Sequence, residues 1–179
     1  MLDAGGTTAA EVAGHVIGLS PAERWSECLA LAAAHQRRWW DLAAPASSAT
    51  AGELLAGPTA KFAGRNSLPL FSRFEKWFAH RDGTIFGCNR HALGPLIGPG
   101  YFMVRDDGSH RLEFDYARVP AQAPPGWPAI RANSGVLARP VYGDLLDKVV
   151  WVAPDVLVGA AYRHGAPLDS YFVLVRTAP

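Results

Sequence analysis

The sequence predicts a mainly β protein, an antiparallel β-barrel of about eight strands behind an α-helical N-terminal segment. The chain has 179 residues, 49% of them hydrophobic, which is enough for one filled core and too little for two typical domains. Residues 1–56 are rich in alanine and hold three helix-start signals, whereas residues 57–179 hold aromatic residues and valine punctuated by glycine and proline. We therefore expect a helical segment, 1–56, packed on a barrel formed by residues 57–179.

Charge and cysteine content exclude several classes of protein. Seventeen basic and sixteen acidic residues give a net charge of +1, which removes the electrostatic argument for a duplex nucleic-acid binder or a polybasic membrane anchor. The two cysteines, Cys28 and Cys88, are too few and too far apart for a disulfide scaffold or a cysteine-built zinc site. No apolar run reaches the roughly 18 residues of a membrane span, and residues 1–6 lack signal-peptide features. We expect a soluble, cytoplasmic protein without a nucleic-acid partner; its oligomeric state is not indicated.

Capping boxes mark the expected helices. In Thr8-Ala-Ala-Glu11 the threonine and the acid three residues later satisfy free amides at a helix start, so a short helix is expected over 9–17. Ser20-Pro21-Ala22-Glu23 adds a proline at the first helical position and predicts a helix over 21–42. Thr50-Ala-Gly-Glu53 predicts one further turn. The long helix is expected to bury Trp25, Leu29 and Trp39 against the barrel, with Trp39-Trp40 acting as a clamp.

The aromatic run 71–78 suits both a helical stripe and a strand. Asp82-Gly83 separates it from a second run, 84–86, and both residues of that dipeptide tolerate the positive φ of a tight hairpin. We interpret the two runs as antiparallel strands.

Five more strands are expected after this hairpin. Residues 100–105 and 111–119 form a second hairpin about Asp106-Asp107-Gly108, and the proline-rich stretch 120–128 is a connection. Three further strands are expected over 136–151, 156–163 and 171–175. Consecutive β-segments without helices predict a meander, and closure into a barrel removes its exposed edges. The interior of such a barrel is filled by side chains or holds one small ligand, and the helical segment would cover one mouth or flank.

The C-terminal 80 residues resemble a known family. The turn Gly98-Pro-Gly-Tyr101-Phe102, the segment Val141-Tyr-Gly-Asp144 to Asp147, and the last strands, Val156-Leu-Val-Gly159 and Tyr171-Phe-Val-Leu-Val-Arg176, are similar to the small bacterial lipocalin-like barrels of the calycin type. The resemblance implies a ligand-binding barrel, and some relatives of such folds are cyclases or isomerases. It transfers no catalytic residue.

Strand alternation identifies ionisable residues on otherwise apolar faces. Arg118 shares a face with Tyr116, Asp147 lies among apolar residues of 141–151, and Arg176 follows Phe172 by an even spacing. A charge-assisted pair of Arg118 with Asp147 across the barrel, beside the Tyr116 hydroxyl, would be a catalytic candidate. The alternative is that these residues end their strands and reach solvent or close a surface salt bridge, most of all Arg176.

Aromatic residues and one polar corner suggest a ligand pocket. The rings of Phe86, Phe102, Phe114, Tyr116, Trp151 and Phe172 exceed what a small packed barrel needs. Asn89, Arg90 and His91 follow a strand, and Gly98–Gly100 allow close backbone approach, so this corner is either a pocket mouth or an ordinary solvated loop. The predicted ligand-binding residues are Phe86, Asn89, His91, Tyr101, Phe114, Tyr116, Arg118, Asp147 and Trp151.

Other chemistry is weakly indicated. The six histidines show no metal-ligand spacing, so neither a metal nor a cofactor is predicted, and Cys88 is interpreted as an inert buried thiol. Seven basic residues between 61 and 105, interleaved with aromatics, would suit single-stranded bases, but a solvated outer barrel face explains them better.

The leading hypothesis is a barrel that binds a small, largely apolar molecule. The alternative is a cyclase or isomerase in the same barrel, with Arg118, Asp147 and Tyr116 as candidate catalytic residues. The third is a protein-interaction module that uses exposed aromatic residues. A cavity above roughly 300 Å³ lined by these polar groups would favour the first two, and a solid core the third.

Overall fold

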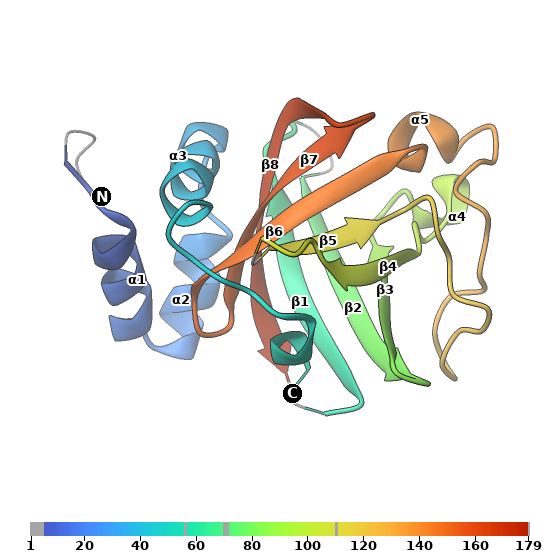
Figure 1. Ribbon diagram of the computed structural model, residues 1–179, viewed down its shortest axis with the longest axis horizontal. Helices are drawn as coiled ribbons and strands as arrows, with labels where there is room; N and C mark the ends of the chain where they lie inside the picture. Colours follow the sequence, from blue (N-terminus) through green and yellow to red (C-terminus); the bar gives the residue numbers. More distant parts are fainter. Residues whose placement is uncertain (1–5, 56, 70–71, 110, 179) are drawn as a thin grey trace.

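Eight antiparallel strands follow one another around a closed barrel (Figure 1). The computed structural model describes residues 6–55, 57–69, 72–109 and 111–178. Pairing of the first strand with the last closes the sheet. The predicted fold class, an antiparallel eight-stranded barrel with a helical N-terminal segment, is confirmed. The strands are β1 (Thr59–Asn66), β2 (Arg73–Arg81), β3 (Thr84–Arg90), β4 (Phe102–Asp106), β5 (Leu112–Asp115), β6 (Leu145–Ala153), β7 (Val156–Arg163) and β8 (Ala166–Ala178).

The hairpin about Asp82-Gly83 is present as predicted. Asp82 and Gly83 have φ angles of 51° and 74°, the left-handed values of a tight turn between twisted strands. This turn sets the register of β2 against β3, with Arg81 opposite Thr84. The described part of the ambiguous run is therefore strand rather than helix; residues 70 and 71 lie outside the described residues.

The sequence pattern missed β1. Its inward positions are Ala60, Phe62 and Gly64, and only one of these is a typical strand residue. Gly64 is required by close packing, because a Cβ atom there would lie 2.5 Å from the Phe74 ring.

The expected strand 136–151 is wrong in its first half. Residues Arg139–Tyr142 form the short helix α5, with Pro140 in its first turn where a missing amide hydrogen is tolerated, and β6 begins only at Leu145. The expected strand 111–119 is also too long, since β5 ends at Asp115. A second short helix, α4 (Gly94–Ile97), lies between β3 and β4.

The capping boxes are present at Thr8, Ser20 and Thr50, each with its acid three residues later. They begin α1 (Ala9–Gly18), α2 (Pro21–Cys28) and the 3-10 turn η1 (Ala51–Leu54). The single helix predicted over 21–42 is wrong, because the chain breaks and restarts as α3 (Ala33–Ala43). The break leaves two carbonyl groups to side-chain donors: the distant Arg65 donates to Leu29 O, and the nearby Gln36 amide donates to Leu31 O. Tertiary contacts override helix propensity here.

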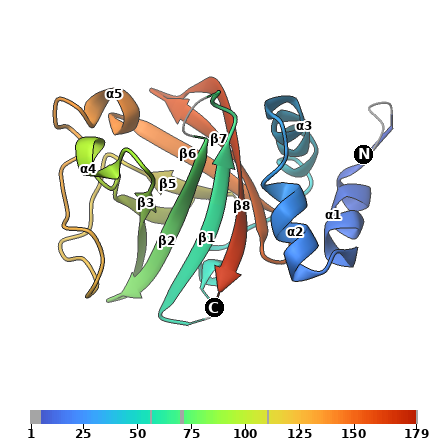
Figure 2. The same cartoon turned by 180° about the vertical axis from the view of Figure 1, so that it is seen from behind.

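The N-terminal helices pack on the outside of the barrel, against β6, β7 and β8 (Figure 2). Leu29 and Trp40 are buried there with a row of barrel valines: Val150, Val152, Val156, Val158, Val173 and Val175. Trp39 is half-buried, whereas Trp25 is 45% exposed, so its predicted burial is wrong. Among the helices of the described residues, none is long and apolar enough to cross a membrane.

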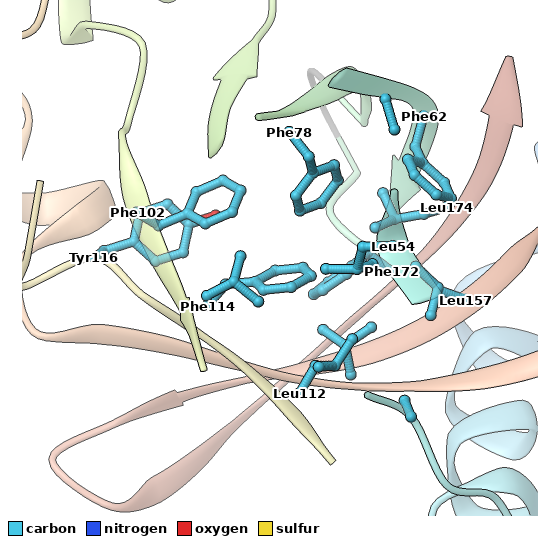
Figure 3. Close-up of a cluster of buried hydrophobic side chains, with 14 of the residues drawn as sticks. Leu54, Phe62, Phe78, Phe102, Leu112, Phe114, Tyr116, Leu157, Phe172 and Leu174 are labelled. Atoms are coloured by element: carbon cyan, nitrogen blue, oxygen red, sulfur yellow. The ribbon is translucent and has the colours of Figure 1, made fainter. Parts of the chain in front are cut away.

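The barrel interior is filled by its own side chains (Figure 3). Phe78 lies near the centre and contacts the rings of Phe62, Phe102 and Phe114 at centroid distances of 5.3 to 5.6 Å. These rings have no surface that a water molecule can touch, so this part of the barrel is solid. One end is plugged by Leu54 of η1, beneath which Arg176 donates to the carbonyls of Glu53 and Leu54.

Candidate functional site

A lysine is buried inside the apolar barrel. Lys76 is the middle inward residue of β2, between Phe74 and Phe78, and its side chain is only 2% exposed. Burying an ammonium group is costly unless every proton finds an acceptor, and such groups gather at functional sites more often than elsewhere.

Three oxygen atoms accept from the Lys76 Nζ atom. They are Asp147 Oδ2 at 3.1 Å, Tyr116 OH at 2.5 Å and Asn89 Oδ1 at 2.9 Å. The acceptors are linked to one another: the Tyr116 hydroxyl donates to Asp147 Oδ2 at 3.1 Å, and Asn89 Nδ2 donates to Tyr116 OH at 3.0 Å. Strands β2, β3 and β6 each contribute one side chain, and Tyr116 directly follows β5. We call these four residues the lysine cluster.

Aromatic rings surround the lysine cluster. The Lys76 Nζ atom lies 4.7 to 5.6 Å from the centroids of five rings, belonging to Phe74, Phe102, Phe114, Tyr116 and Phe172. The negative faces of such rings attract a cation. The site therefore combines one carboxylate with an apolar, electron-rich wall, which suits a single positive charge.

Burial and pairing act in opposite directions on the ionisable groups. Burial lowers the pKa of Lys76, and Asp147 opposes that shift. Burial likewise raises the pKa of Asp147, opposed by Lys76, and raises that of Tyr116 well above its usual value. The pair has zero net charge both as ammonium with carboxylate and as amine with carboxylic acid. A proton can therefore move between Lys76 and Asp147 without creating a net charge in the barrel.

A tyrosine of α5 covers the lysine cluster. The Tyr142 ring stacks on Tyr116 with a centroid distance of 5.5 Å and an interplanar angle of 8°. Its hydroxyl lies 2.6 Å from His91 Nε2. Gly100, at a φ of 51°, makes room for this ring, because a Cβ atom there would collide with it. Asn89, His91 and Gly100 of the predicted corner therefore lie close together at the α5 end of the barrel.

A cleft of about 420 Å³ opens beside this end. The residues that line it are Gly64, Phe74, His91, Trp25 of α2, Leu29 directly after α2, and the charged Arg73, Glu75 and Arg90. Phe74 borders the cleft on one side and has Lys76 Nζ 5.6 Å from its ring centroid on the other. Phe74 is therefore the side chain that lies between the cleft and Lys76.

The structure brings together some of the predicted site residues. Tyr116, Asp147 and Asn89 are in direct contact, the Phe114 ring is beside them, and His91 lies at their edge. Arg118 does not belong to this group. It follows the end of β5, is 72% exposed and pairs with Asp115 at 3.6 Å on the outer surface, so the predicted Arg118–Asp147 pair is absent.

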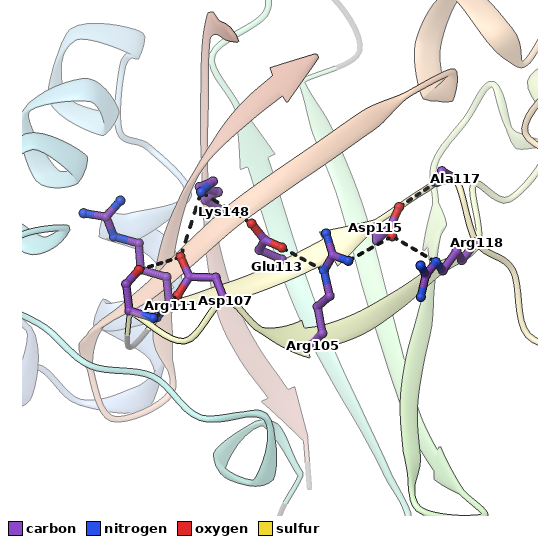
Figure 4. Close-up of polar contacts among 9 residues, drawn as sticks. Arg105, Asp107, Arg111, Glu113, Asp115, Ala117, Arg118 and Lys148 are labelled. Atoms are coloured by element: carbon purple, nitrogen blue, oxygen red, sulfur yellow. Dashed lines mark hydrogen bonds and ion pairs between the residues drawn. The ribbon is translucent and has the colours of Figure 1, made fainter. Parts of the chain in front are cut away.

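The outer surface near Arg118 carries an extended charge network (Figure 4). Arg105 binds Glu113 at 2.8 Å, and Lys148 approaches Glu113 at 3.4 Å and Asp107 at 3.9 Å. Ion pairs thus join side chains of β4, β5 and β6 on the outer face of the barrel. Arg118 belongs to this outer face, as the alternative of a surface salt bridge predicted.

Three other predicted pocket residues lie elsewhere. Phe86 and Tyr101 point out of the barrel and are buried against Trp127 of the long connection. Trp151 is at the opposite end, where its indole donates to Glu53. Arg176, expected either to reach solvent or to close a salt bridge at its strand end, pairs with Asp155 at 2.7 Å, and its own side chain is 13% exposed. Cys88 is a buried free thiol whose pKa burial raises to about 12, as expected of an inert cysteine.

Sequence reasoning missed Lys76 itself. The alternation Phe74, Lys76, Phe78 was visible, but this run also fitted a helix, and Lys76 was grouped with the outer basic residues. A signal was available: a lysine at the centre of an inward strand face, matched by Asp147 on another.

A second cavity, of about 560 Å³, lies outside the barrel between α1, α2 and α3. Its floor includes Val12, Val16 and Leu31, and the polar groups of His15, His35 and Arg38 line its edge. Within the described ranges no group of three or more His, Cys, Asp or Glu side chains is arranged to hold a metal ion.

No family model, curated protein or solved structure matches this chain.

Proposed function

We propose that the barrel binds a small, largely apolar molecule at its α5 end, with the polar group of that molecule held by the lysine cluster. The observation that carries this proposal is the burial of Lys76, hydrogen-bonded to Asp147, Tyr116 and Asn89, inside a shell of aromatic rings. Replacing a buried ion pair by apolar residues often leaves a protein as stable or makes it more stable, so stability alone does not account for this charge. The resemblance to lipocalin-like barrels implies the same class of function.

Two features of the α5 end support entry of an apolar molecule. The adjoining cleft reaches Phe74, directly outside the lysine cluster. Large apolar side chains are exposed around α4 and α5: Val136 is 90% exposed, and Leu96, Leu137 and Val141 are exposed as well. Exposed apolar groups gathered at one place mark binding surfaces.

Two buried free thiols, Cys28 and Cys88, suit a reducing compartment such as the cytoplasm.

The barrel interior is filled, an outcome that on cavity volume alone favours the protein-interaction module. Binding of a small molecule therefore requires a side chain to move. Phe74 is the best placed, since it is only half-buried and lies between the cleft and Lys76. Removing its ring in Phe74→Ala should open the path and tighten the binding of an apolar anionic dye such as anilinonaphthalene sulfonate. Phe86→Ala is the matched control, because it removes the same ring from outside the barrel.

Fluorescence titration tests the proposal, with Trp25 of the cleft as an internal reporter. We expect saturable one-to-one binding by the natural chain, tighter binding by Phe74→Ala and no change in Phe86→Ala. Absence of saturable binding in both the natural chain and Phe74→Ala would overturn the proposal.

A second candidate is an isomerase or cyclase that uses the same cluster. The observation in its favour is the direct hydrogen bond from the Tyr116 hydroxyl to Asp147, which pairs a proton donor with an acceptor next to a cation. Arg118 has no place in this candidate. Turnover of an apolar substrate that is lost in Tyr116→Phe, while dye binding persists, would favour this enzyme over a carrier.

A further inference from the structure

Lysine is scarce in this chain. It has three lysines, Lys61, Lys76 and Lys148, against fourteen arginines. The other two lysines lie on the outer surface, whereas Lys76 is at the centre of the barrel. An arginine would supply a permanent cation, but only a lysine can give up its proton and act as a nucleophile. The residue type at position 76 therefore suits a reacting amine better than a fixed charge.

We propose that Lys76 condenses with the carbonyl group of an apolar aldehyde or ketone to form an imine. This inference rests on the ligand-binding function proposed above and names the substrate class of that site. The geometry that supports it is the contact of Nζ with one carboxylate, one hydroxyl and one amide, all inside an aromatic wall.

The protons needed for condensation are available within the cluster. Asp147 Oδ2, 3.1 Å from Nζ, takes one proton from the ammonium group, and the freed electron pair forms the bond from nitrogen to the carbonyl carbon. The π electrons of the carbonyl group move to its oxygen, and a proton passes from nitrogen to that oxygen through the Tyr116 hydroxyl, giving a carbinolamine. Asp147 then returns its proton to the carbinolamine oxygen, which leaves as water while the nitrogen electron pair forms the C=N bond.

The products balance the reactants. An ammonium ion and a carbonyl compound become an iminium ion and water, no oxidant or reductant takes part, and the positive charge stays on the same nitrogen. The carboxylate of Asp147 and the five rings that stabilise the ammonium therefore also attract the iminium cation. The iminium nitrogen keeps one proton, so two of the three acceptors, Tyr116 and Asn89, are released to bind water or substrate.

Reductive trapping tests this inference on the full chain. The protein is incubated with cinnamaldehyde and cyanoborohydride, and peptide mapping assigns the reduced adduct among the three lysines. We expect Lys76 to be modified at least about tenfold faster than the exposed Lys61, because Lys76 combines a carboxylate 3.1 Å away with a wall of aromatic rings. Modification of Lys61 and Lys148 with Lys76 left intact would overturn the inference.

Controls separate this inference from the proposed function. Cinnamyl alcohol has the same shape but forms no imine, so its displacement of the dye reports binding alone. If the alcohol displaces the dye and Lys76 is never trapped, the imine is refuted and ligand binding stands. If the dye does not bind saturably and Lys76 is not trapped, both fall. Asp147→Asn removes the acid that returns a proton to the carbinolamine oxygen, so trapping at Lys76 should slow while that at Lys61 is unchanged. An equal or higher rate at Lys76 would refute the role of Asp147 in this proton transfer.

Discussion

Neutralising Asp147 by the nearly isosteric change Asp147→Asn should destabilise the protein by about 3–5 kcal/mol near pH 7. The carboxylate lies 3.1 Å from the Lys76 ammonium, and both side chains are almost completely buried. Without it, the ammonium must stay unpaired or lose its proton. The free energy of removing this proton is the upper limit of the destabilisation. Each pH unit below the ordinary lysine pKa of about 10.4 costs about 1.4 kcal/mol, which amounts to about 5 kcal/mol near pH 7.

The destabilisation caused by each single substitution therefore depends on pH, with a sign that can be worked out. In Asp147→Asn, burial lowers the pKa of Lys76, so the unfolded chain binds more protons than the folded one and stability rises with pH. The cost should fall to about 2 kcal/mol near pH 9. In Lys76→Met the unpaired group is Asp147, whose pKa burial raises, so that cost should instead shrink as the pH falls towards about 5.

A double-mutant cycle completes the test. Lys76→Met/Asp147→Asn buries no charge and should lose only about 1–2 kcal/mol, for the hydrogen bonds removed. Guanidinium chloride unfolding, followed by tryptophan fluorescence at about pH 5, 7 and 9, gives the four free energies. Arg118→Met is the control and should change nothing measurable, since that side chain is 72% exposed. Single-variant costs that are independent of pH, or that simply add in the double variant, would refute the buried ion pair.

Three further predictions follow from the packing. Removing residues 6–50 while keeping η1 should expose the valines of β6, β7 and β8 and cause aggregation; a soluble, monodisperse product in size-exclusion chromatography would contradict this. Gly87→Ala should lower the unfolding free energy by about 1–3 kcal/mol, because the added Cβ atom would lie 2.5 Å from both the Phe102 ring and the Trp77 carbonyl oxygen. The control Gly94→Ala, which has open space around it, should lower the unfolding free energy far less in the same denaturation assay. Phe114→Asp should abolish folding rather than ligand binding alone, because Phe114 is fully buried against Phe78 and Phe102; a native circular dichroism spectrum and melting temperature would show this reasoning to be wrong.

Local signals in the sequence predicted most of the fold. Capping boxes at Thr8, Ser20 and Thr50 and the Asp82-Gly83 turn depend on a few adjacent residues, and each is found where it was expected. The errors arise where distant contacts decide. The helix break after Cys28 is stabilised by Arg65, which is 36 residues from the carbonyl it binds. Strand β1 has small inward residues because the Phe74 ring occupies the space beside Gly64.

The candidate site was only half predictable for the same reason. Alternation placed Tyr116 and Asp147 on inward faces correctly, because each lies on or directly beside a regular strand. Arg118 was misplaced because alternation was extended past Asp115, where the strand ends. The partner of Asp147 could not be deduced from spacing, since Lys76 is 71 residues away and meets it only through barrel closure.

The filled interior determines how tightly any ligand can bind. If the binding-competent state requires the Phe74 ring to leave its place beside Phe172, the observed affinity is the intrinsic affinity multiplied by the fraction of molecules in that state. An opening cost of about 2.8 kcal/mol would weaken binding about a hundredfold. Phe74→Ala removes this cost, so the ratio of its dye affinity to that of the natural chain measures the opening free energy directly. Equal affinities in the two proteins, with binding still competed by cinnamyl alcohol, would show that the ligand stays in the outer cleft and never reaches Lys76.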